Sequence, residues 1–481
     1  MLFNSHYFIN YFLLSFLILC FAINFKNKNQ LLIILFSFLF YAYWSLYYAI
    51  LLIFIIISNY WLINLFDMSH LIKKRLLLFL IFYNLFFLFF FKYSKDLLKF
   101  LNFEITGNFW TNIVLPIGIS FYIFQIISYA IDVYNNKKLK VNFLNYFAFI
   151  IFFPQLIAGP ILKITEFYPD IKKNFLFNHY NFISGFSVFI IGLSKKVIIA
   201  DNLSEYTNLL FADSELSSVS PMTACFLVFL YSFEIYYDFS GYSDMAVGIC
   251  RILGLNNVPF NFNSPFKQTS IIEFWKNWNI TLTRFIREYI FFPLVSVLRK
   301  LEFLKNNINF TIVLSAILTF FIVGIWHGSG VNFIIFGLLH GLYFAINFYF
   351  NSLNVSFLNN RNLKIIYWLL TFVCISFSFV FFRSANLTQA LMILNNIFDR
   401  SLLDFALINT SENRFYFKII FVLVMMNILL PNSRDFIQYL YTAIKKKNYF
   451  KSIIIGFFLS LIFFFSYFLL NNQKQFIYFQ F

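Results

Sequence analysis

Two histidines, His327 and His340, lie in a stretch of the chain without charged side chains. Residues 306–360 contain no Asp, Glu, Lys or Arg, and this length allows two membrane crossings of about 20 residues each. An ionisable side chain in a membrane segment is costly, so it marks a functional site by default. A neutral imidazole near pH 7 can take a proton from a hydroxyl. Each histidine is therefore either a general base or a structural residue that bonds a backbone carbonyl or lies at the membrane surface.

The glycines after His327 favour it over His340. Gly328-Ser329-Gly330 should end the preceding helix, because glycine costs helix stability and permits other backbone conformations. His327 would then lie at a helix end, beside a cavity or an interface. If residues 330–340 are helical, about 15–20 Å separates the two histidines at 1.5 Å per residue. We therefore do not expect them to form one dyad.

A second group of candidates surrounds Asn279. Helical spacing between residues 273 and 289 places these side chains on one apolar face: Trp275, Trp278, Leu282, Phe285, Ile286 and Tyr289. The opposite face is too charged to cross a membrane, so we expect this helix at the membrane surface or beneath a funnel. Asn279 falls on the apolar face, and a buried amide needs partners. It is either a core residue that bonds the backbone or an amide that holds an acyl carbonyl or orients His327.

Two carboxylates stand at the end of another apolar run. Glu234 and Asp238 are one helical turn apart, so they share a helix face. Ser240-Gly241 should end this helix. Asp238 or Ser240 then either caps the following helix or lines a polar cavity.

Basic fragments and missing motifs narrow the chemistry further. Lys195-Lys196 with Asp201 indicates a helix end at the cytoplasmic surface. Arg383 is either an anchor whose charge extends to the membrane surface or a binding group for an anionic donor.

The sequence has no Gly-Lys-Ser phosphate loop, no His-Glu-x-x-His and no Gly-x-Ser-x-Gly motif. Its four cysteines lie singly, without ligand spacing. ATP hydrolysis, metalloprotease chemistry and a metal site are therefore disfavoured.

The elements that position these residues must be membrane helices. Of 481 residues, 61% are hydrophobic and 12% are charged, and continuous apolar runs such as 29–66 differ from the alternating strands of a membrane barrel. An interruption at Phe153-Pro154-Gln155-Leu156-Ile157-Ala158-Gly159-Pro160 predicts a re-entrant segment buried in protein. We predict an all-α integral membrane protein with about 11–13 transmembrane or re-entrant helices. The clearer ones centre near residues 16, 38, 56, 83, 123, 150, 190, 230, 318, 340, 373, 423 and 461.

Charge placement predicts the orientation. The formal net charge of +16 arises mostly in short loops such as Lys73-Lys74-Arg75, which is typical of cytoplasmic loops and not of nucleic-acid binding. Basic residues follow the first apolar segment, about 7–25, and precede the last, about 452–470, so we expect both termini outside. The first segment lacks a small-residue cleavage site and is interpreted as a retained helix.

The predicted organisation is a single polytopic membrane domain over residues 1–481. An amphipathic, partly interfacial region lies within it at 251–305. The segment 306–350 follows and carries the candidate catalytic histidine.

Several segments of the chain match one family pattern. They are Leu115-Pro116-Ile117-Gly118-Ile119-Ser120-Phe121, residues 153–160, Gly192-Leu193-Ser194-Lys195-Lys196, Tyr237-Asp238-Phe239-Ser240-Gly241-Tyr242-Ser243-Asp244, Phe274-Trp275-Lys276-Asn277-Trp278-Asn279, Trp326-His327-Gly328, Phe381-Phe382-Arg383-Ser384 and Phe476-Ile477-Tyr478-Phe479-Gln480-Phe481. Together they resemble the membrane-bound O-acyltransferase family over most of the chain. Among its bacterial members, the type that acetylates alginate or peptidoglycan is the most similar.

The resemblance implies a core with a central funnel, in which His327 is the catalytic histidine and Asn279 occupies the second active-site position. The subgroup usually carries histidine at that second position, whereas lipid-acylating relatives of eukaryotes carry asparagine. The chain therefore departs from its subgroup at Asn279. Other candidates along the substrate funnel are Asp238, Ser240, Tyr242, Asp244, Trp275, Trp278 and Trp326, with His340 and Arg383 as weaker ones.

The resemblance also implies a reaction and its partners. A cytoplasmic donor, acetyl-CoA, would pass an acetyl group across the bacterial inner membrane to a hydroxyl acceptor, for O-acetylation of an alginate-like polymer or peptidoglycan. No bound cofactor or metal is implied. The expected partner is a secreted SGNH-type acetyltransferase or a small membrane protein. Two alternatives stay open: D-alanyl transfer to teichoic acid from a carrier-protein thioester, and non-enzymatic transport of a lipid-linked sugar.

Overall fold

The computed structural model describes residues 3–22, 28–101, 114–173, 178–212, 219–352, 363–398, 410–445, 449–472, 474 and 477. All regular secondary structure within these ranges is helical. Each of the helix centres predicted from the sequence falls inside a described helix. The prediction of an all-α membrane protein is therefore confirmed.

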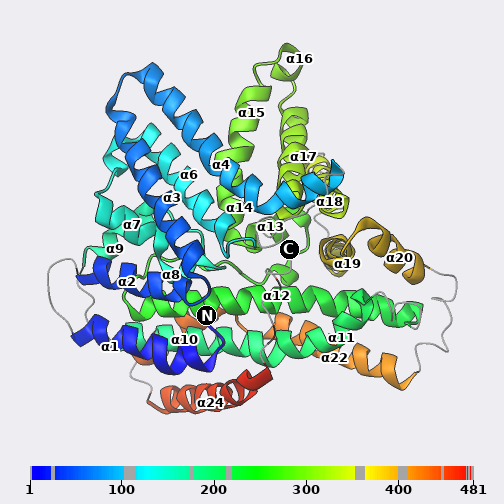
Figure 1. Ribbon diagram of the computed structural model, residues 1–481. Helices are drawn as coiled ribbons and strands as arrows, with labels where there is room; N and C mark the ends of the chain where they lie inside the picture. The colour runs from blue at the N-terminus through cyan, green and yellow to red at the C-terminus, as the bar shows by residue number, and fades with distance from the viewer. Residues whose placement is uncertain are drawn as a thin grey trace. The chain divides into compact units, whose positions relative to one another are not determined.

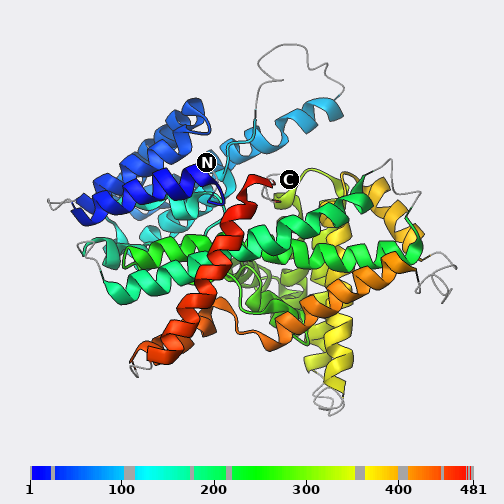
Figure 2. The same cartoon turned by 90° about the horizontal axis from the view of Figure 1, so that it is seen from below.

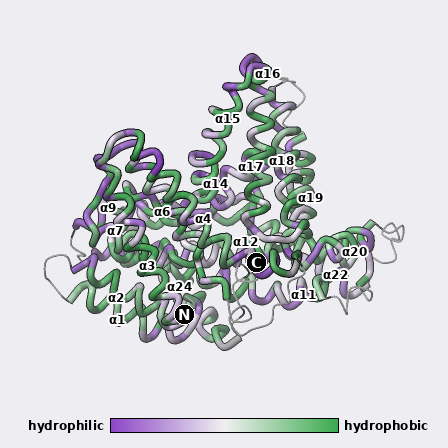
Figure 3. Tube along the Cα trace, turned by 45° about the horizontal axis from the view of Figure 1, so that its top comes forward, coloured by the Kyte–Doolittle hydropathy of each residue, from purple (hydrophilic) through white to green (hydrophobic). Residues whose placement is uncertain are grey.

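Many of these helices are long and apolar enough to cross a membrane. Within the described residues, 7 helices meet this condition, and one further bent pair, Ser411–Leu429 with Ser433–Ala443, meets it jointly. Figure 3 shows hydrophobic residues along α17 (Ile308–His327), α18 (Val331–Ser352) and α19 (Lys364–Arg383). Hydrophilic residues lie at the short α16 (Glu302–Lys305). Their exposed faces carry large apolar side chains, as helices in lipid require.

The chain packs as two compact units, and the first covers residues 1–194, 241–260 and 437–473. Its helices are η1 (Phe8–Leu13), α1 (Leu14–Ala22), α2 (Lys28–Ala42), α3 (Leu46–Asn64), η2 (Leu65–Asp67), α4 (His70–Phe100), α6 (Ile119–Asn135), η3 (Lys137–Leu139), α7 (Phe143–Ile151), α8 (Phe153–Leu156), α9 (Ile164–Ile171), α10 (His179–Ser194), α24 (Tyr449–Phe468) and η11 (Leu469–Asn472). Figure 2 shows α24 crossing α10, where the rings of Phe186 and Phe463 lie 5.7 Å apart.

The interrupted apolar segment lies in the first unit. After the single turn of α8, residues 157–163 are not helical, yet residues 151–162 are all buried. Gly118, at a φ of 73°, precedes α6, and a Cβ there would lie 1.9 Å from the carbonyl oxygen of Leu156. Only glycine allows this approach of the two loops. The irregular backbone is thus enclosed by protein, as predicted.

The second unit covers residues 195–240, 261–436 and 474–481. Its helices are η4 (Lys195–Ala200), α11 (Asp201–Phe211), η6 (Pro265–Lys267), α13 (Ile271–Asn277), α14 (Ile280–Ile286), η7 (Arg287–Phe291), α15 (Phe292–Leu298), α16, α17 (Ile308–His327), α18 (Val331–Ser352), α19 (Lys364–Arg383), α20 (Leu387–Ile397) and α22 (Ser411–Leu429). Helices α12 (Pro221–Ile252) and α23 (Ser433–Lys445) contribute to both units.

The hairpin of α17 and α18 dominates the second unit, and the two helices run side by side (Figure 1). Asn307 caps the start of α17 by accepting the N–H of Phe310 at 3.1 Å. Glycines let the two backbones touch: a Cβ on Gly324 would lie 2.5 Å from the carbonyl oxygen of Phe333. The helix ends at His327 and restarts at Val331, so the predicted glycine break is confirmed.

Two helix predictions were wrong. Helix α12 runs through Ser240-Gly241 without a break, because a single glycine costs a helix only about 1 kcal/mol and α12 packs closely on α10 here. A Cβ on Gly192 of α10 would lie 2.6 Å from the carbonyl oxygen of Gly241. Neither Asp238 nor Ser240 therefore caps a helix. The expected continuous helix over 273–289 is instead divided at Trp278 and Asn279 into α13 and α14.

Candidate active site

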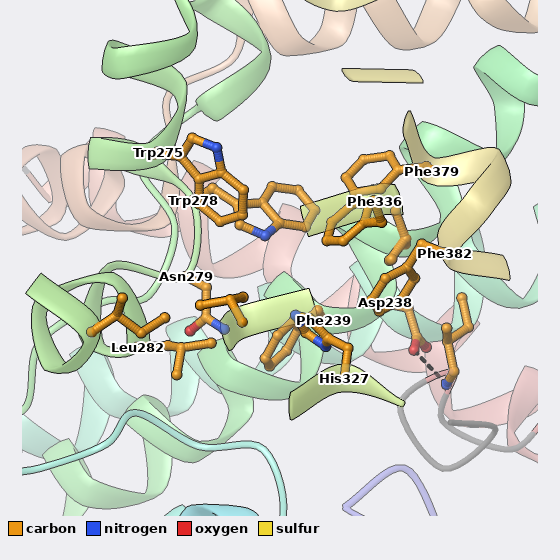
Figure 4. Close-up of a pocket in the computed structure, with 14 residues that line it drawn as sticks. Asp238, Phe239, Trp275, Trp278, Asn279, Leu282, His327, Phe336, Phe379 and Phe382 are labelled. Carbon is orange, nitrogen blue, oxygen red and sulfur yellow. Dashed lines mark hydrogen bonds between the residues drawn. The ribbon is translucent and has the colours of Figure 1, made fainter. Parts of the chain in front are cut away.

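A small pocket in the second unit brings the main sequence candidates together (Figure 4). Its volume is about 50 Å³. It is lined by Ile235, Asp238, Phe239, Trp275, Trp278, Asn279, Leu282, Ile286, Val323, His327, Phe336, Phe379, Phe382 and Ile477. Only Asp238, Asn279 and His327 among these bring ionisable or amide groups. The pocket is therefore an apolar enclosure with three polar groups, a usual form of a small-molecule site.

His327 is the last residue of α17 and is half-buried in the pocket wall. Its imidazole packs between aromatic rings, with centroid distances of 5.0 Å to Phe382 and 5.8 Å to Phe336. The centroid of the Trp326 indole lies 4.5 Å from that of the imidazole. These rings restrict the orientation of the imidazole while leaving it at the pocket surface.

Asn332, the second residue of α18, secures this arrangement. Its amide donates to the carbonyl oxygens of Phe381 at 3.0 Å and of Ser384 at 2.9 Å. Phe381 lies in the last turn of α19 and Ser384 directly follows the helix, so neither carbonyl has a partner within it. The hydrogen bonds thus tie the hairpin to the end of α19 and keep Phe382 against His327.

Asn279 reaches the pocket because the backbone reverses at this residue. Its φ of 40° and ψ of 57° are left-handed, a conformation that asparagine tolerates better than most residues. The flanking chain is fixed by Asn261, whose carbonyl oxygen accepts the N–H of Ile280 at 2.8 Å and whose side chain accepts the hydroxyl of Thr281 at 2.6 Å. Asn279 is buried, and its Oδ1 has no hydrogen-bond partner among the described residues. A buried polar atom of this kind needs a partner, which a bound substrate can supply.

Trp275 and Trp278 form one wall of the pocket, and Asn279 and His327 lie on the same side of them in Figure 4. Trp278 stacks on Phe274 at 5.3 Å and packs against Phe379 at 5.6 Å. The indole N–H of Trp275 donates to Nδ1 of His340 at 3.3 Å. His340 is fully buried and does not line the pocket, so it lies behind this wall.

Asp238 is the acidic member of the pocket and also lines a second, polar cavity of about 250 Å³. This polar cavity is bounded by Lys196, Ala200, Asp201, Ser204, Asn208, Glu234, Asp238, Lys474 and Ile477. One carboxylate oxygen of Asp238 accepts the backbone N–H of Ile477 at 2.9 Å, and the other pairs with Lys196. The shared face of Glu234 and Asp238, predicted from their spacing, is confirmed by their common lining of this cavity.

Lys196 corrects a further expectation from the sequence. It does not lie at a helix end, because α10, η4 and α11 follow one another without a gap. Its side chain is buried, and its ammonium pairs with Asp201 at 2.8 Å as well as with Asp238. A buried cation of this kind requires such partners. Arg383 lies beside the same region, with one guanidinium nitrogen 3.4 Å from Oδ1 of Asn208 and the group 5.4 Å above the ring of Phe211.

The other candidates from the sequence lie outside the pocket lining. Ser240 accepts a hydrogen bond from Lys195 at 3.0 Å. Tyr242 and Asp244 are buried in the first unit, where the ring of Tyr242 stacks on Phe3 at 4.5 Å. Trp326 does not line the pocket, but its ring lies against that of His327. Of the segment 476–481, only Ile477 belongs to the described residues.

The sequence did not single out the phenylalanines that complete the pocket. Phe239, Phe336, Phe379 and Phe382 line it, but the chain contains 77 phenylalanines. Phe239 and Phe382 stood inside recognised motifs, and that position was the one available signal. Phe336 and Phe379 carried none, because a ring in an apolar helix looks the same whether it faces lipid or a pocket.

The chemistry available in the pocket follows from its few polar groups. An imidazole can remove a proton from a hydroxyl, and an amide can hold a carbonyl or the oxyanion formed from it. The apolar rings exclude water, which strengthens such interactions. Proton abstraction coupled to attack on a carbonyl is therefore within reach of this arrangement.

The family comparison agrees with this chemistry. The profile of the membrane-bound O-acyltransferase family matches residues 126–384. The chain belongs to this family. It is 36% identical to the peptidoglycan O-acetyltransferase of Helicobacter pylori, over 82% of the chain and 80% of that protein. It is 34% identical to the "Probable alginate O-acetylase" of Pseudomonas aeruginosa, over 81% of the chain and 73% of that protein.

A more distant relative is the teichoic acid D-alanyltransferase of Bacillus subtilis, 29% identical over 56% of the chain and 69% of that protein. As a member of the membrane-bound O-acyltransferase family, the chain is an acyltransferase and a multi-pass membrane protein. Its family profile spans every element that lines the pocket except the segment around Ile477.

Proposed function

We propose that this membrane O-acyltransferase transfers an acetyl group from acetyl-CoA to a hydroxyl acceptor, and so O-acetylates a cell-surface polysaccharide. The observation that carries the proposal is the meeting of His327 and Asn279 in one small apolar pocket of a family member. The names of its relatives point to peptidoglycan or an alginate-like polymer as the polysaccharide.

In the proposed mechanism His327 is the general base. It takes the proton of the acceptor hydroxyl as the oxygen attacks the thioester carbonyl. The side-chain amide N–H of Asn279 donates a hydrogen bond to the carbonyl oxygen while negative charge develops on it. Collapse of the tetrahedral intermediate breaks the carbon–sulfur bond, and the thiolate takes the proton from His327. The ester and the free thiol then leave, with the imidazole returned to its neutral form.

The acceptor and the partner follow from the location of the polymer. The donor would bind from the cytoplasm and the acetyl group would leave outside, with both chain termini outside the bacterial inner membrane. The hydroxyl belongs either to the sugar or to a serine of a partner, an SGNH-type acetyltransferase or a small membrane protein that passes the group on. No bound cofactor or metal takes part in the proposed reaction.

Replacement of His327 by alanine in the producing cell tests the proposal. We expect O-acetylation of the surface polymer to fall to background while the protein still accumulates in the membrane. Acetate released from the isolated polymer measures its O-acetylation. An immunoblot of the membrane fraction measures the amount of protein. Unchanged polymer acetylation at a normal protein level would contradict the proposal.

D-alanyl transfer is the second candidate, because teichoic acid D-alanyltransferases share detectable similarity with about half of the chain. The two candidates require different donors. Purified protein in liposomes should consume acetyl-CoA, whereas a D-alanyltransferase would need an aminoacyl thioester on a carrier protein. A neighbouring gene for an SGNH-type esterase would support acetylation, and a carrier-protein gene would support D-alanylation. Acyl turnover in either assay also separates an enzyme from a transporter.

A further inference from the structure

The pocket beside His327 and Asn279 is small, with a volume of about 50 Å³, and Trp275 is part of its wall. In an apolar site, one methylene group more or less changes selectivity by about 10- to 200-fold. The position of such a wall can therefore decide which acyl group fits.

The indole of Trp275 is held in the wall by a hydrogen bond to a residue outside the pocket, His340. Tryptophan Nε1 is a donor only, so Nδ1 of His340 must be the acceptor in their 3.3 Å hydrogen bond. The remaining ring nitrogen, Nε2, lies 2.9 Å from the hydroxyl oxygen of Ser378. That hydroxyl donates to the carbonyl oxygen of Ile375 at 2.6 Å. The chain of bonds fixes His340 as the neutral tautomer that carries its proton on Nε2.

Aromatic rings close the space around this hydrogen-bond chain. The indole of Trp275 meets the imidazole of His340 edge-on at 5.0 Å and packs against Phe320 at 5.3 Å. Phe336 contacts His340 at 4.6 Å and is itself a pocket residue. His340 and Ser378 are fully buried. If the indole swung away from the pocket, it would break the bond to His340 and leave Nδ1 buried without its partner, which is unfavourable.

We propose that Trp275, locked by His340 and Ser378, sets the length of the acyl group that the enzyme accepts. This inference rests on the proposed function, because it takes the pocket to be the place where the acyl group is held. Trp275 is the specificity-determining residue, and His340 and Ser378 are positioning residues that act through it. The two histidines of the hairpin thus have separate tasks: His327 handles the proton and His340 fixes the wall.

The test measures acyl-chain selectivity in purified protein reconstituted in liposomes. Transfer rates with acetyl-, propionyl-, butyryl- and hexanoyl-CoA give kcat/KM for each donor. For Trp275→Leu we expect the butyryl-to-acetyl ratio to rise by about tenfold or more, since one or two methylene groups in an apolar pocket change selectivity by that order. His340→Leu should raise the same ratio to a smaller extent. His340→Gln, which keeps an acceptor oxygen, should restore a ratio close to that of the unaltered protein.

A matched control and a milder variant make the outcome decisive. Ile346→Ala replaces an exposed residue of α18 and should leave the ratio unchanged. Trp275→Phe keeps an aromatic ring but lacks the N–H group, and should shift the ratio in the same direction as Trp275→Leu. The inference is overturned if variants that still transfer acetyl groups keep the original ratio, or if Ile346→Ala shifts it equally. Loss of transfer from every donor by the unaltered protein would instead overturn the proposed function.

Discussion

The two cavities of the second unit share Asp238 and Ile477. They differ in whether the buried polar groups that line them have partners within the protein. In the polar cavity, the ammonium of Lys196 is matched by Asp201 and Asp238, and a hydroxyl of Thr207 bonds Glu234. In the apolar pocket, Oδ1 of Asn279 is buried without a hydrogen-bond partner among the described residues. A cavity whose charges satisfy one another contributes to stability, whereas a pocket that withholds partners from a polar group is prepared for a substrate. Variants in the two cavities should therefore separate activity from stability.

The largest effect is expected from His327→Gln in the apolar pocket. Glutamine is polar and of similar length but cannot accept a proton from a hydroxyl, so loss of the general base should lower acyl transfer about 10²–10⁴-fold. Turnover of acetyl-CoA by reconstituted protein measures the rate. Thermal unfolding in detergent should change little in the same preparation. A variant that keeps more than a tenth of the original rate would show that His327 is not the base.

Lys196→Met in the polar cavity should give the opposite result. Removal of one partner from a buried ion pair leaves uncompensated charge, here on Asp201 and Asp238, and costs about 3–5 kcal/mol in the free energy of unfolding. Thermal or denaturant unfolding in detergent measures the loss, together with the yield of folded protein. If Lys196→Met proved as stable as the unaltered protein, the polar cavity would not have the structural role that its paired charges indicate.

Asn279→Gly tests the amide without disturbing the backbone. Glycine adopts the left-handed conformation at least as readily as asparagine, so the turn between α13 and α14 should persist. Loss of a group that holds a developing oxyanion should lower kcat about a hundredfold, with little change in unfolding temperature. Asn279→Ala provides the comparison, because it lacks the amide and also strains the turn. Equal rates for Asn279→Gly and the unaltered protein would assign Asn279 a structural role only.

The smallest effect is expected from Lys276→Met, the matched control for Lys196→Met. Lys276 pairs with Glu273 at 2.7 Å, but both side chains are about half exposed. Solvent-screened pairs of this kind contribute about 0–1 kcal/mol. Unfolding measured alongside Lys196→Met should show a clear difference between the two lysines. A similar loss at both positions would mean that burial does not explain the effect at Lys196.

Hydropathy and helical spacing predicted where the helices lie, but glycine positions predicted the helix ends correctly in one case and wrongly in another. Every centre predicted from hydropathy lies within a helix, because each membrane helix must satisfy its own backbone within an apolar segment. The glycines after His327 did end a helix, but Ser240-Gly241 did not, since α12 packs closely on α10 there, through Gly192. The sequence shows a glycine in both situations, and only the packing of the neighbouring helix distinguishes them. Helical spacing likewise placed Asn279 on an apolar face but could not foresee the reversal at a φ of 40°.

The sequence by itself determined that the chain is a helical membrane protein, that its motifs match one acyltransferase family, and that His327 lies at a helix end. These are properties of composition and of short segments, which do not depend on distant parts of the chain. The tertiary structure alone decided which side chains meet: that Lys196 is buried between two carboxylates, that His340 bonds Trp275, and that four phenylalanines close the pocket around His327. Several of these contacts join distant residues, such as Lys196 with Asp238 and Trp275 with His340, which is 65 positions away. Their chemistry depends on burial, which no local pattern of a uniformly apolar chain reveals.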